Sequence, residues 1–538
     1  MNKNDVFEIE ITGMTDDGSG VGRAEGIAVF VPYTIVGETV RTHIIKVNKT
    51  YAIGKLLEVV VPAQTRVKAE CPYFYRCGGC QLWHMDYSEE LKFKQNKVSD
   101  CIKRIAGLDV PVSEIIGADC VSRYRNKVQL PVSNEGIGFY RRNSHDVIDM
   151  YDCLLQSTDT KKIIDSIRKW MCEYDIEPYD EKEKSGNIRH IYTRSCDGGI
   201  MVVIVTKEDE LPNKKELISA ISDTKLKISG IIQNINARDT NVVLGRKNII
   251  LWGREFVSDK LDKLNFEISP NSFYQVNKTQ MLKLYSEAKR MAGLTGHEML
   301  WDVYCGIGTI GQFMADECGI VVGIEIVPEA VENARENARL NNIKNAEYYC
   351  GAAEKLAPVL VGEGLKPDVV VLDPPRRGCD ERLLNTIIKV KPKRIVYISC
   401  KPSTLARDLK YLNSNGYTPQ KIVPVDMFPR TCHVETVCQL VLRRSPVHIN
   451  IDVDVEELVQ DKRGQATYEQ IKAYVLEHSG LKVSSLYIAQ VKHKCGIIER
   501  ENYNKPKSED AKQLICPPEK EAAIKEALEH FGMIGSVK

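Results

Sequence analysis

The sequence predicts a multidomain protein with a small β-barrel first, an α+β domain second, a doubly wound α/β domain third and a helical extension last. Three patterns predict this order. Short β-prone runs separated by glycine turns fill residues 1–60, strands and helices alternate through residues 298–444, and helical patterns follow a polar stretch after Ser445. A length of 538 residues also fits several compact units better than a single core. We place the domains at residues 1–60, 61–265, 266–444 and 445–538.

The composition is that of an ordinary globular protein and excludes a fibrous or largely disordered chain. Apolar residues make up 43% and charged residues 27% of the sequence. Because 74 basic residues balance 73 acidic ones, any polyanionic partner must be held by local basic patches. No window approaches the length of a membrane helix, and the N-terminus MNKNDVFEIE has no apolar core of a signal peptide. We therefore expect a cytoplasmic protein with no membrane partner.

The first 60 residues have the pattern of a five-stranded, OB-like β-barrel. Their β-prone runs are FEIEITGM, IAVFVPYT, ETVRTHIIKV and YAIGKLLEVV, and glycine-containing turns separate several of them. Small barrels of this kind often bind oligonucleotides, and they also serve as structural appendages. This stretch alone leaves both roles open.

Residues 61–265 begin with the cysteine-rich segment CPYFYRCGGC and continue through strand and helix patterns that predict an α+β domain. Cys77 and Cys80 form a close pair, Cys71 is a looser member, and Cys153 is a distant fourth candidate. Seventeen cysteines without a signal peptide favour thiols, metal ligands or a nucleophile over disulfides. The spacing fits zinc and an iron–sulfur cluster equally well, and unrelated thiols are the alternative, above all for Cys153.

The α/β domain opens with a glycine loop in LWDVYCGIGTIGQFM. Gly306, Gly308 and Gly311 form GxGxxG, and Glu325 ends the next strand. In a Rossmann-like sheet this arrangement brings the backbone close to an adenosine-containing ligand, while the acidic side chain binds its ribose. The loop alone fits S-adenosylmethionine (SAM) and a dinucleotide equally well.

Two later strands end in residues that carry chemistry. Asp373, Pro374 and Pro375 leave one strand, and Cys400 ends the next, so both lie at the carboxyl edge where open α/β sheets bind ligands. Cys400 also precedes a helix, a setting that can lower the pKa of a thiol. A small, buried, structural cysteine is the alternative.

A thiol at this edge suits one demanding reaction, methylation of carbon 5 of a uridine. That carbon is a poor nucleophile until a thiolate adds to carbon 6, and a base must then remove the carbon 5 proton. Cys400 is the candidate thiolate. Glu435 and His433 are both candidate bases on sequence grounds.

The chain resembles the RNA uracil-5-methyltransferases. The matching motifs, in order, are SPNSFYQVN, DVYCGIGTIG, GIEIVPEAV, LDPPRRG, YISCKPSTLARDL and FPRTCHVETV. The resemblance covers residues 1 to about 444 and implies a SAM methyltransferase domain with Cys400 as nucleophile and Glu435 as base. The residues that it implies bind SAM are Gln275, Tyr304, Glu325 and Asp373.

The N-terminal barrel is similar to a TRAM domain. Family members that carry this domain act on large-subunit ribosomal RNA and bind a [4Fe-4S] cluster, whereas the tRNA branch commonly lacks both. The resemblance therefore implies 23S rRNA as substrate and a structural cluster. Its implied ligands are Cys71, Cys77, Cys80 and Cys153.

Further RNA contacts are expected from the barrel and from basic segments interleaved with aromatics. These segments are 92–94, 124–127 and 139–142, each of which fits a solvated face equally well. In the extension, helices that carry Lys482, Lys492, His493 and Lys494 fit a helix-turn-helix-like module, or helices that simply pack together. We expect a monomer.

Two other functions compete with this interpretation. A dinucleotide oxidoreductase would use the glycine loop and the cysteines, but it leaves Cys400 and Asp373 without a role. A non-catalytic RNA-binding assembly factor would keep the fold without the chemistry. A tRNA uracil-5-methyltransferase would keep the chemistry and change the substrate.

Overall fold

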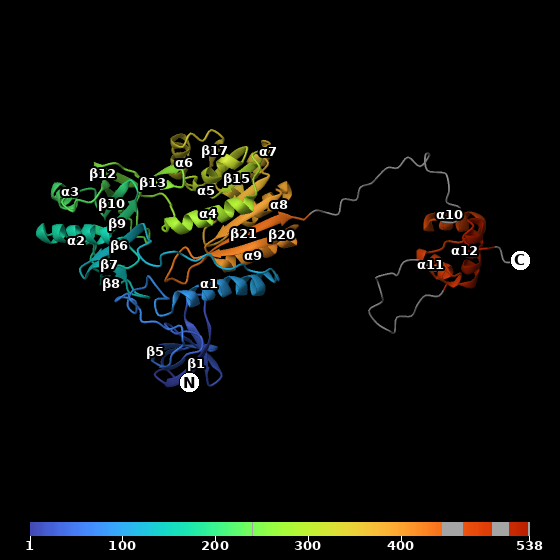
Figure 1. The fold of residues 1–538 in the computed structure, drawn as a ribbon, viewed down its shortest axis with the longest axis horizontal. Coiled ribbons are helices and arrows are strands. Elements are labelled where there is room, and N and C mark those ends of the chain that lie inside the picture. The colour runs from blue at the N-terminus through green and yellow to red at the C-terminus, as the bar shows by residue number, and fades with distance from the viewer. Residues whose placement is uncertain (239, 444–465, 498–515, 536–538) are drawn as a thin grey trace. The chain divides into compact units, whose positions relative to one another are not determined.

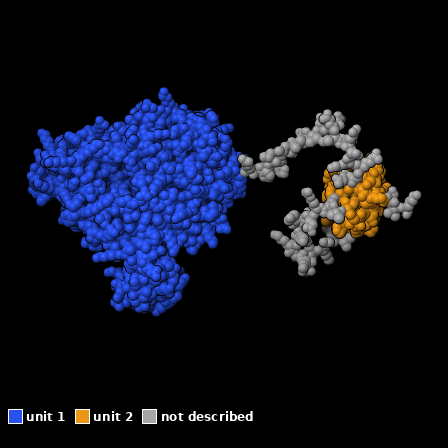
Figure 2. Space-filling view, viewed as in Figure 1, with its two compact units in different colours: residues 1–444 blue, residues 445–538 orange. Residues whose placement is uncertain are grey.

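The computed structural model describes residues 1–238, 240–443, 466–497 and 516–535. The chain forms two compact units, residues 1–444 and 445–538 (Figures 1 and 2). The polar linker expected at residues 450–465 lies outside the described residues. No described helix combines the length and the apolar character that crossing a membrane requires.

The N-terminal barrel is confirmed as a closed, five-stranded barrel. Its strands are joined in the order β1-β2-β3-β5-β4. Alternate side chains of each strand point inward, so Ile9 and Ile11 are buried while Glu8 and Glu10 are exposed. The strand bounds are β1 (Val6–Met14), β2 (Gly20–Ala24), β3 (Ile27–Val31), β4 (Thr39–Val47) and β5 (Tyr51–Val61).

Helix α1 (Tyr87–Cys101) follows the cysteine-rich segment and packs on the α/β domain of residues 266–444. Asp86 caps its N-terminus by accepting a hydrogen bond from the backbone N–H of Glu89. A short π-helix, η1 (Ile102–Ala106), continues α1 and ends at Gly107, whose φ of 67° favours glycine. α1 contacts α9 and β20, so it joins a domain that begins much later in the sequence.

The central domain is a seven-stranded sheet covered by α2 (Thr158–Glu173) and α3 (Lys214–Ser222). The strand order is β12-β11-β10-β9-β6-β7-β8. Every residue of β10 is buried, which explains the continuous apolar run GIMVVIVT. The strands are β6 (Lys127–Ser133), β7 (Gly136–Tyr140), β8 (Val147–Asp149), β9 (Ile188–Cys196), β10 (Gly199–Thr206), β11 (Ile228–Ile235) and β12 (Lys247–Gly253). A hairpin of β13 (Val257–Leu261) and β14 (Leu264–Ile268) follows.

The α/β domain contains a second seven-stranded sheet, with the order β17-β16-β15-β18-β19-β21-β20. Its strands are β15 (Met299–Val303), β16 (Ile320–Glu325), β17 (Ala346–Cys350), β18 (Val369–Leu372), β19 (Arg394–Ser399), β20 (Tyr417–Val425) and β21 (Glu435–Leu442). Its helices are α4 (Lys278–Ala292), α5 (Thr309–Met314), η2 (Ala315–Glu317), α6 (Pro328–Leu340), α7 (Ala353–Gly362), α8 (Glu381–Val390) and α9 (Pro402–Ser414).

Helices cover both faces of this sheet (Figure 1). Neighbouring residues of β15 point to opposite faces, since Leu300 lies in the core under α4 and α5 while Trp301 lies in the core under α7, α8 and α9. β15 to β19 run parallel, and β21 is inserted antiparallel between β19 and β20. The chain leaves β15 toward β16 and later returns to its other side as β18. This reversal creates a crevice at the carboxyl ends of the strands.

The second unit is a small helical domain of α10 (Tyr468–Ser479), α11 (Ser485–Lys494) and α12 (Pro518–His530), which share an apolar core. These helices occupy the segments where the sequence predicts helices. Lys492 is buried and its ammonium lies 4.5 Å from the ring centroid of Tyr468. For Lys492 this supports the alternative in which the helices simply pack together, because its side chain belongs to the packing of this unit.

Candidate active site

A pocket of about 780 Å³ opens at the carboxyl ends of the parallel strands β15, β16 and β18 in the α/β domain. Its volume suits a cofactor-sized ligand. All six residues predicted to bind SAM or to react line this one pocket: Gln275, Tyr304, Glu325, Asp373, Cys400 and Glu435. His433, the alternative base, lines it as well.

The glycine loop after β15 reaches the pocket through Gly306. Gly306 has a φ of 55°, lines the pocket, and has no atom within 4 Å of where a β-carbon would stand. Its N–H donates to one carboxylate oxygen of Glu325 at 3.1 Å, while the other oxygen accepts the N–H groups of Ile326 and Val327. These bonds fix the acidic side chain at the end of β16, where the sequence predicts a ribose-binding acid.

Tyr304 directly follows β15 and has a strained conformation. Its φ of 67° is unusual for a residue other than glycine, and such strain is often found at functional sites. The Tyr304 N–H donates to the Ile324 carbonyl at 2.9 Å and holds this geometry. Gln275 approaches the pocket from the segment before α4, where its carbonyl accepts a hydrogen bond from Asn126 at 3.0 Å. Arg125, Lys127 and Gln129 of the central domain also line the pocket, so two domains contribute to it.

Cys400 and Glu435 lie beside each other because β19 and β21 are antiparallel. Ser399 pairs with Thr436, so the residue after Ser399 lies beside the residue before Thr436. Glu435 also pairs with Val425 on the other side. The sheet thus brings a thiol and a carboxyl, 35 positions apart in the sequence, to the same point of the pocket.

Three carboxyls lie at this edge, and we term them the edge carboxyls: Asp302 and Glu435 are buried, and Asp373 is half-buried. Burial raises the pKa of Glu435 to about 8, and the Asp373 carboxylate adds to the shift while Arg376 opposes it. Burial and Asp302 raise the pKa of Asp373 to about 7. A carboxyl that titrates near neutral pH suits general acid–base catalysis.

The thiol does not behave as its position before a helix suggested. Burial, and next the carboxylates of Glu435 and Asp373, raise the pKa of Cys400 to about 11. These effects outweigh the opposing charge of Arg376. The expected lowering is therefore wrong for the free protein. His433 is neutral at pH 7, since burial and nearby cations lower its pKa to about 4.

Several residues at the pocket were missed by sequence reasoning. Arg376 and Arg377 line it directly after the Asp-Pro-Pro exit of β18, where the paired arginines of LDPPRRG were the available signal. Phe273 also lines it and is 64% exposed. Nothing in the local pattern distinguished Phe428, which arrives from the loop before β21.

The predicted RNA-contacting segments have different positions. Arg125 and Lys127 line the pocket, and burial next to other cations lowers the pKa of Lys127 to about 8. Lys92 is on the surface, but Phe93 and Lys94 are buried, so segment 92–94 is not a solvated basic face. Lys94 therefore fits neither an RNA contact nor a solvated face. Its partners are described below.

The four predicted cluster ligands converge on one small pocket that also contains Phe74 and Trp83. Burial raises the pKa of all four thiols: Cys71, Cys77, Cys80 and Cys153. Within the described part of the chain, however, no group of three or more His, Cys, Asp or Glu side chains is arranged as a metal site. The predicted cluster is not shown by this geometry.

Comparison with known proteins identifies the class as SAM-dependent RNA methyltransferases. The chain is 46% identical over 443 residues to an uncharacterized RNA methyltransferase of Clostridium tetani, covering 81% of this chain and 96% of that protein. It is 45% identical over 450 residues to one of Halalkalibacterium halodurans, covering 82% and 98%. The solved Pyrococcus abyssi tRNA (uracil-54, C5)-methyltransferase with S-adenosyl-L-homocysteine superposes with a TM-score of 0.67 at 30% identity, covering 81% of this chain and all of that one.

The chain belongs to the tRNA (uracil-5-)-methyltransferase family, whose sequence model matches residues 86–444. A TRAM domain matches residues 2–57, which contain nearly all of the barrel. The helical unit after residue 444 lies outside both matches.

Proposed function

We propose that the protein methylates carbon 5 of a uridine in 23S rRNA through a transient bond between the Cys400 sulfur and carbon 6. The observation that carries this proposal is the juxtaposition of Cys400 and Glu435 across β19 and β21, inside the pocket of a SAM-dependent methyltransferase. A thiol and a base at one point are the two groups that this chemistry needs.

The residues divide the reaction between them. The Cys400 thiolate forms a bond to carbon 6, and the electron pair of the carbon 5–carbon 6 double bond moves toward carbon 5 and oxygen 4. When bound, SAM would supply the methyl group to carbon 5 and leave as S-adenosylhomocysteine, whose sulfur keeps the electron pair of the broken bond. The Glu435 carboxylate removes the carbon 5 proton, the double bond reforms, and the carbon–sulfur bond breaks to regenerate the thiolate. The base must leave its stack to reach Cys400.

The cofactor would be held by Gln275, Tyr304, Glu325 and Asp373 around the open side of Gly306. Support comes from the pocket, since Gly306 leaves room for a close approach and Glu325 is fixed at the end of β16. In this arrangement the Glu325 carboxylate would bind ribose hydroxyls, and the carboxyl of Asp373 would lie next to the reacting groups.

The four cysteines would hold a [4Fe-4S] cluster with a structural role, because the methyl transfer needs no electrons. Their convergence on one pocket and their thiolate chemistry support this. The test is iron and sulfide content after anaerobic purification. About four irons per chain, lost in a Cys80→Ser variant, are expected. A protein without iron that still methylates RNA would reject the cluster.

The choice of 23S rRNA rests on the resemblance, in which the TRAM domain and the cysteine set occur together in the ribosomal branch. A tRNA substrate is the second candidate, because the Pyrococcus abyssi protein of similar structure acts on tRNA. We also propose that the protein works as a monomer in the cytoplasm; light scattering tests the first of these.

Incubation with SAM and either 23S rRNA or tRNA, followed by mass spectrometry of the digested nucleosides, tests the substrate. We expect 5-methyluridine in 23S rRNA only. Product in tRNA alone would replace the substrate and keep the chemistry. No product in either RNA, in spite of bound SAM, would favour a non-catalytic RNA-binding factor. A bound dinucleotide instead of SAM would favour the oxidoreductase.

A further inference from the structure

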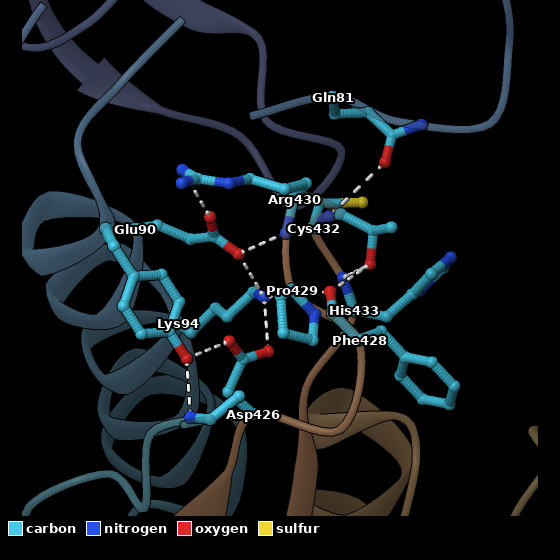
Figure 3. Close-up of polar contacts among 12 residues, drawn as sticks. Gln81, Glu90, Lys94, Asp426, Phe428, Pro429, Arg430, Cys432 and His433 are labelled. Atoms are coloured by element: carbon cyan, nitrogen blue, oxygen red, sulfur yellow. Dashed lines mark hydrogen bonds and ion pairs between the residues drawn. The ribbon is translucent and has the colours of Figure 1, made fainter. Parts of the chain in front are cut away.

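The loop of residues 426–434 joins β20 to β21 and leads directly into Glu435; we term it the catalytic loop. Phe428, Thr431 and His433 of this loop line the active-site pocket together with Glu435. The conformation of the catalytic loop therefore determines how the carboxyl beside Cys400 is placed. Figure 3 shows the loop next to the helix that carries Glu90 and Lys94.

Six of the nine backbone carbonyls of the catalytic loop accept hydrogen bonds from groups outside it. The donors come from the cysteine-rich segment, from α1, from the segment before β6 and from the start of α4. The bonds are Gln280 Nε2 to Asp426 O (3.0 Å), Asn277 Nδ2 to Met427 O (3.2 Å), Lys94 Nζ to Phe428 O (3.1 Å), Tyr124 Oη to Pro429 O (3.0 Å), Gln81 N and Leu82 N to Arg430 O (3.1 Å each), and Lys97 Nζ to Cys432 O (3.0 Å). A surface loop usually leaves such groups to water. This loop is fixed by its surroundings.

Lys94 lies at the centre of these contacts (Figure 3). Its ammonium donates to Glu90 Oε1 at 2.7 Å, Asp426 Oδ1 at 2.6 Å and Phe428 O at 3.1 Å, and its side chain is 0% exposed. An ammonium has three donors, and all three are used. Burial disfavours the charge, but Glu90 and Asp426 raise the pKa of Lys94, so it stays protonated.

The charges around Lys94 balance one another. Glu90 Oε1 also accepts the backbone N–H of Arg430 at 2.7 Å, and Glu90 Oε2 lies 3.5 Å from the Arg430 guanidinium. Asp426 Oδ2 accepts a hydrogen bond from the Tyr87 hydroxyl at 2.7 Å. Two buried carboxylates thus face two cations, which satisfies the requirement that buried charges be paired.

The residues that follow the cysteine-rich segment bind the same loop through hydrogen bonds. Gln81 and Leu82, which follow Cys80, donate their N–H groups to the Arg430 carbonyl, and Gln81 Oε1 accepts the N–H of Cys432 at 3.3 Å (Figure 3). The two residues that directly follow the cysteine-rich segment are therefore hydrogen-bonded to the catalytic loop on both sides of Thr431.

We propose that Lys94 is a positioning residue for the methyl transfer, which fixes the catalytic loop so that Glu435 stays beside Cys400, and that Gln81 and Leu82 hold the same loop from the other side of the contact. This inference rests on the function proposed above. A stabilising role alone does not explain the arrangement, because replacing a buried ion pair with apolar side chains often leaves stability unchanged or higher. Lys94 also fixes the position of the catalytic loop on α1, since its three donors bind Glu90 of α1, Asp426 and the Phe428 carbonyl at one point.

Two substitutions in α1 test the proposal. Lys94→Met keeps much of the side chain's length and removes its charge and donors. Lys92→Met is the matched control, because Lys92 is 69% exposed and contacts only Glu89, at 3.9 Å, among the ion pairs of the described residues. Tyr124→Phe is a milder variant that removes only the hydrogen bond to the Pro429 carbonyl.

Two readouts separate positioning from folding. The first readout is kcat together with the KM for SAM, measured with the RNA that the wild-type protein methylates as substrate. The second needs no RNA: the rate at which iodoacetamide alkylates Cys400 as a function of pH, followed by peptide mass spectrometry. In Lys94→Met we expect kcat to fall on the order of 100-fold, because a misplacement of about 1 Å costs this much. The KM for SAM should change little, and half-maximal alkylation should move to lower pH as Glu435 leaves the thiol. Tyr124→Phe should lower kcat several-fold, and Lys92→Met should match the wild type.

Wild-type kcat and alkylation in a folded Lys94→Met protein that binds SAM would overturn the proposal. If Lys94→Met does not fold, Tyr124→Phe decides, and wild-type values in that variant would overturn it equally. A wild-type protein inactive on every RNA, combined with shifted Cys400 alkylation in Lys94→Met, would reject the proposed function and keep the positioning role.

Discussion

Replacing Glu435 by glutamine should change both the rate and the shape of the pH profile. In the proposed mechanism, catalysis requires the Glu435 carboxylate and the Cys400 thiolate. Burial and neighbouring carboxylates raise their pKa values in the free protein to about 8 and about 11. At pH 7 only about a tenth of the protein carries an ionised Glu435. The profile of kcat/KM reports the free enzyme, so log(kcat/KM) should rise with a slope of two below pH 8 and a slope of one above it.

The Glu435→Gln variant has no carboxyl to ionise. Its log(kcat/KM) should rise with a slope of one throughout, because only the thiol still titrates, and its activity should be lower on the order of 10²- to 10⁴-fold. The assay is methyl transfer from labelled SAM between pH 6 and 9.5. The Arg376 guanidinium lowers the pKa of both Glu435 and Cys400. In Arg376→Gln, the change of slope seen near pH 8 in the wild type should therefore move to higher pH. A wild-type profile of the same shape as that of Glu435→Gln would refute Glu435 as the base.

Three further results are expected. The melting temperature of the free protein should fall as the pH rises from 6.5 to 8, because the folded state still binds protons at the edge carboxyls that the unfolded state has already lost. Buried histidines have the opposite effect on stability, but only below about pH 6.5. A melting temperature that stays constant from pH 6.5 to 8 would contradict the raised pKa values of the edge carboxyls. Gly308→Ala should lower the free energy of unfolding by about 1–2 kcal/mol, since its φ is 79° and a β-carbon would lie 2.8 Å from the Tyr348 hydroxyl, whereas Gly362→Ala, with open space around it, should cost nothing in denaturant titrations. A chain that ends at residue 444 should keep the wild-type kcat, because the family match ends there and residues 445–538 form a separate unit; loss of activity in a folded truncation would give that unit a role in catalysis.

The parts of the site that local sequence predicts are those at strand ends. Gly306, Glu325, Asp373 and Cys400 each follow or end a parallel strand, and the carboxyl ends of parallel strands share one edge. Their convergence therefore followed from the alternation of strands and helices. The resemblance supplied what this rule does not reach, Gln275 and Glu435.

Strand order set the limit of the local reasoning. Hydrophobic patterns do not show that β21 inserts antiparallel between β19 and β20, and this insertion is what brings Glu435 beside Cys400. The Cys400 pKa was misjudged for a related reason, since burial and the carboxylates come from other strands.

Lys94 shows the same limit for a single side chain. In the sequence it belongs to a basic pattern on an amphipathic helix, which is typical of a solvated face. Its buried position depends on Asp426, 332 positions away, and on Phe428. No local pattern carries that information.

The covalent intermediate is the most direct test of the account. RNA that contains 5-fluorouridine has no removable proton at carbon 5, so incubation with the protein and SAM should trap the methylated adduct, visible as a protein–RNA band on a denaturing gel. We expect this band with the wild-type protein and its absence with Cys400→Ala. The absence of an adduct with both 23S rRNA and tRNA, or an adduct that persists in Cys400→Ala, would contradict the proposed mechanism.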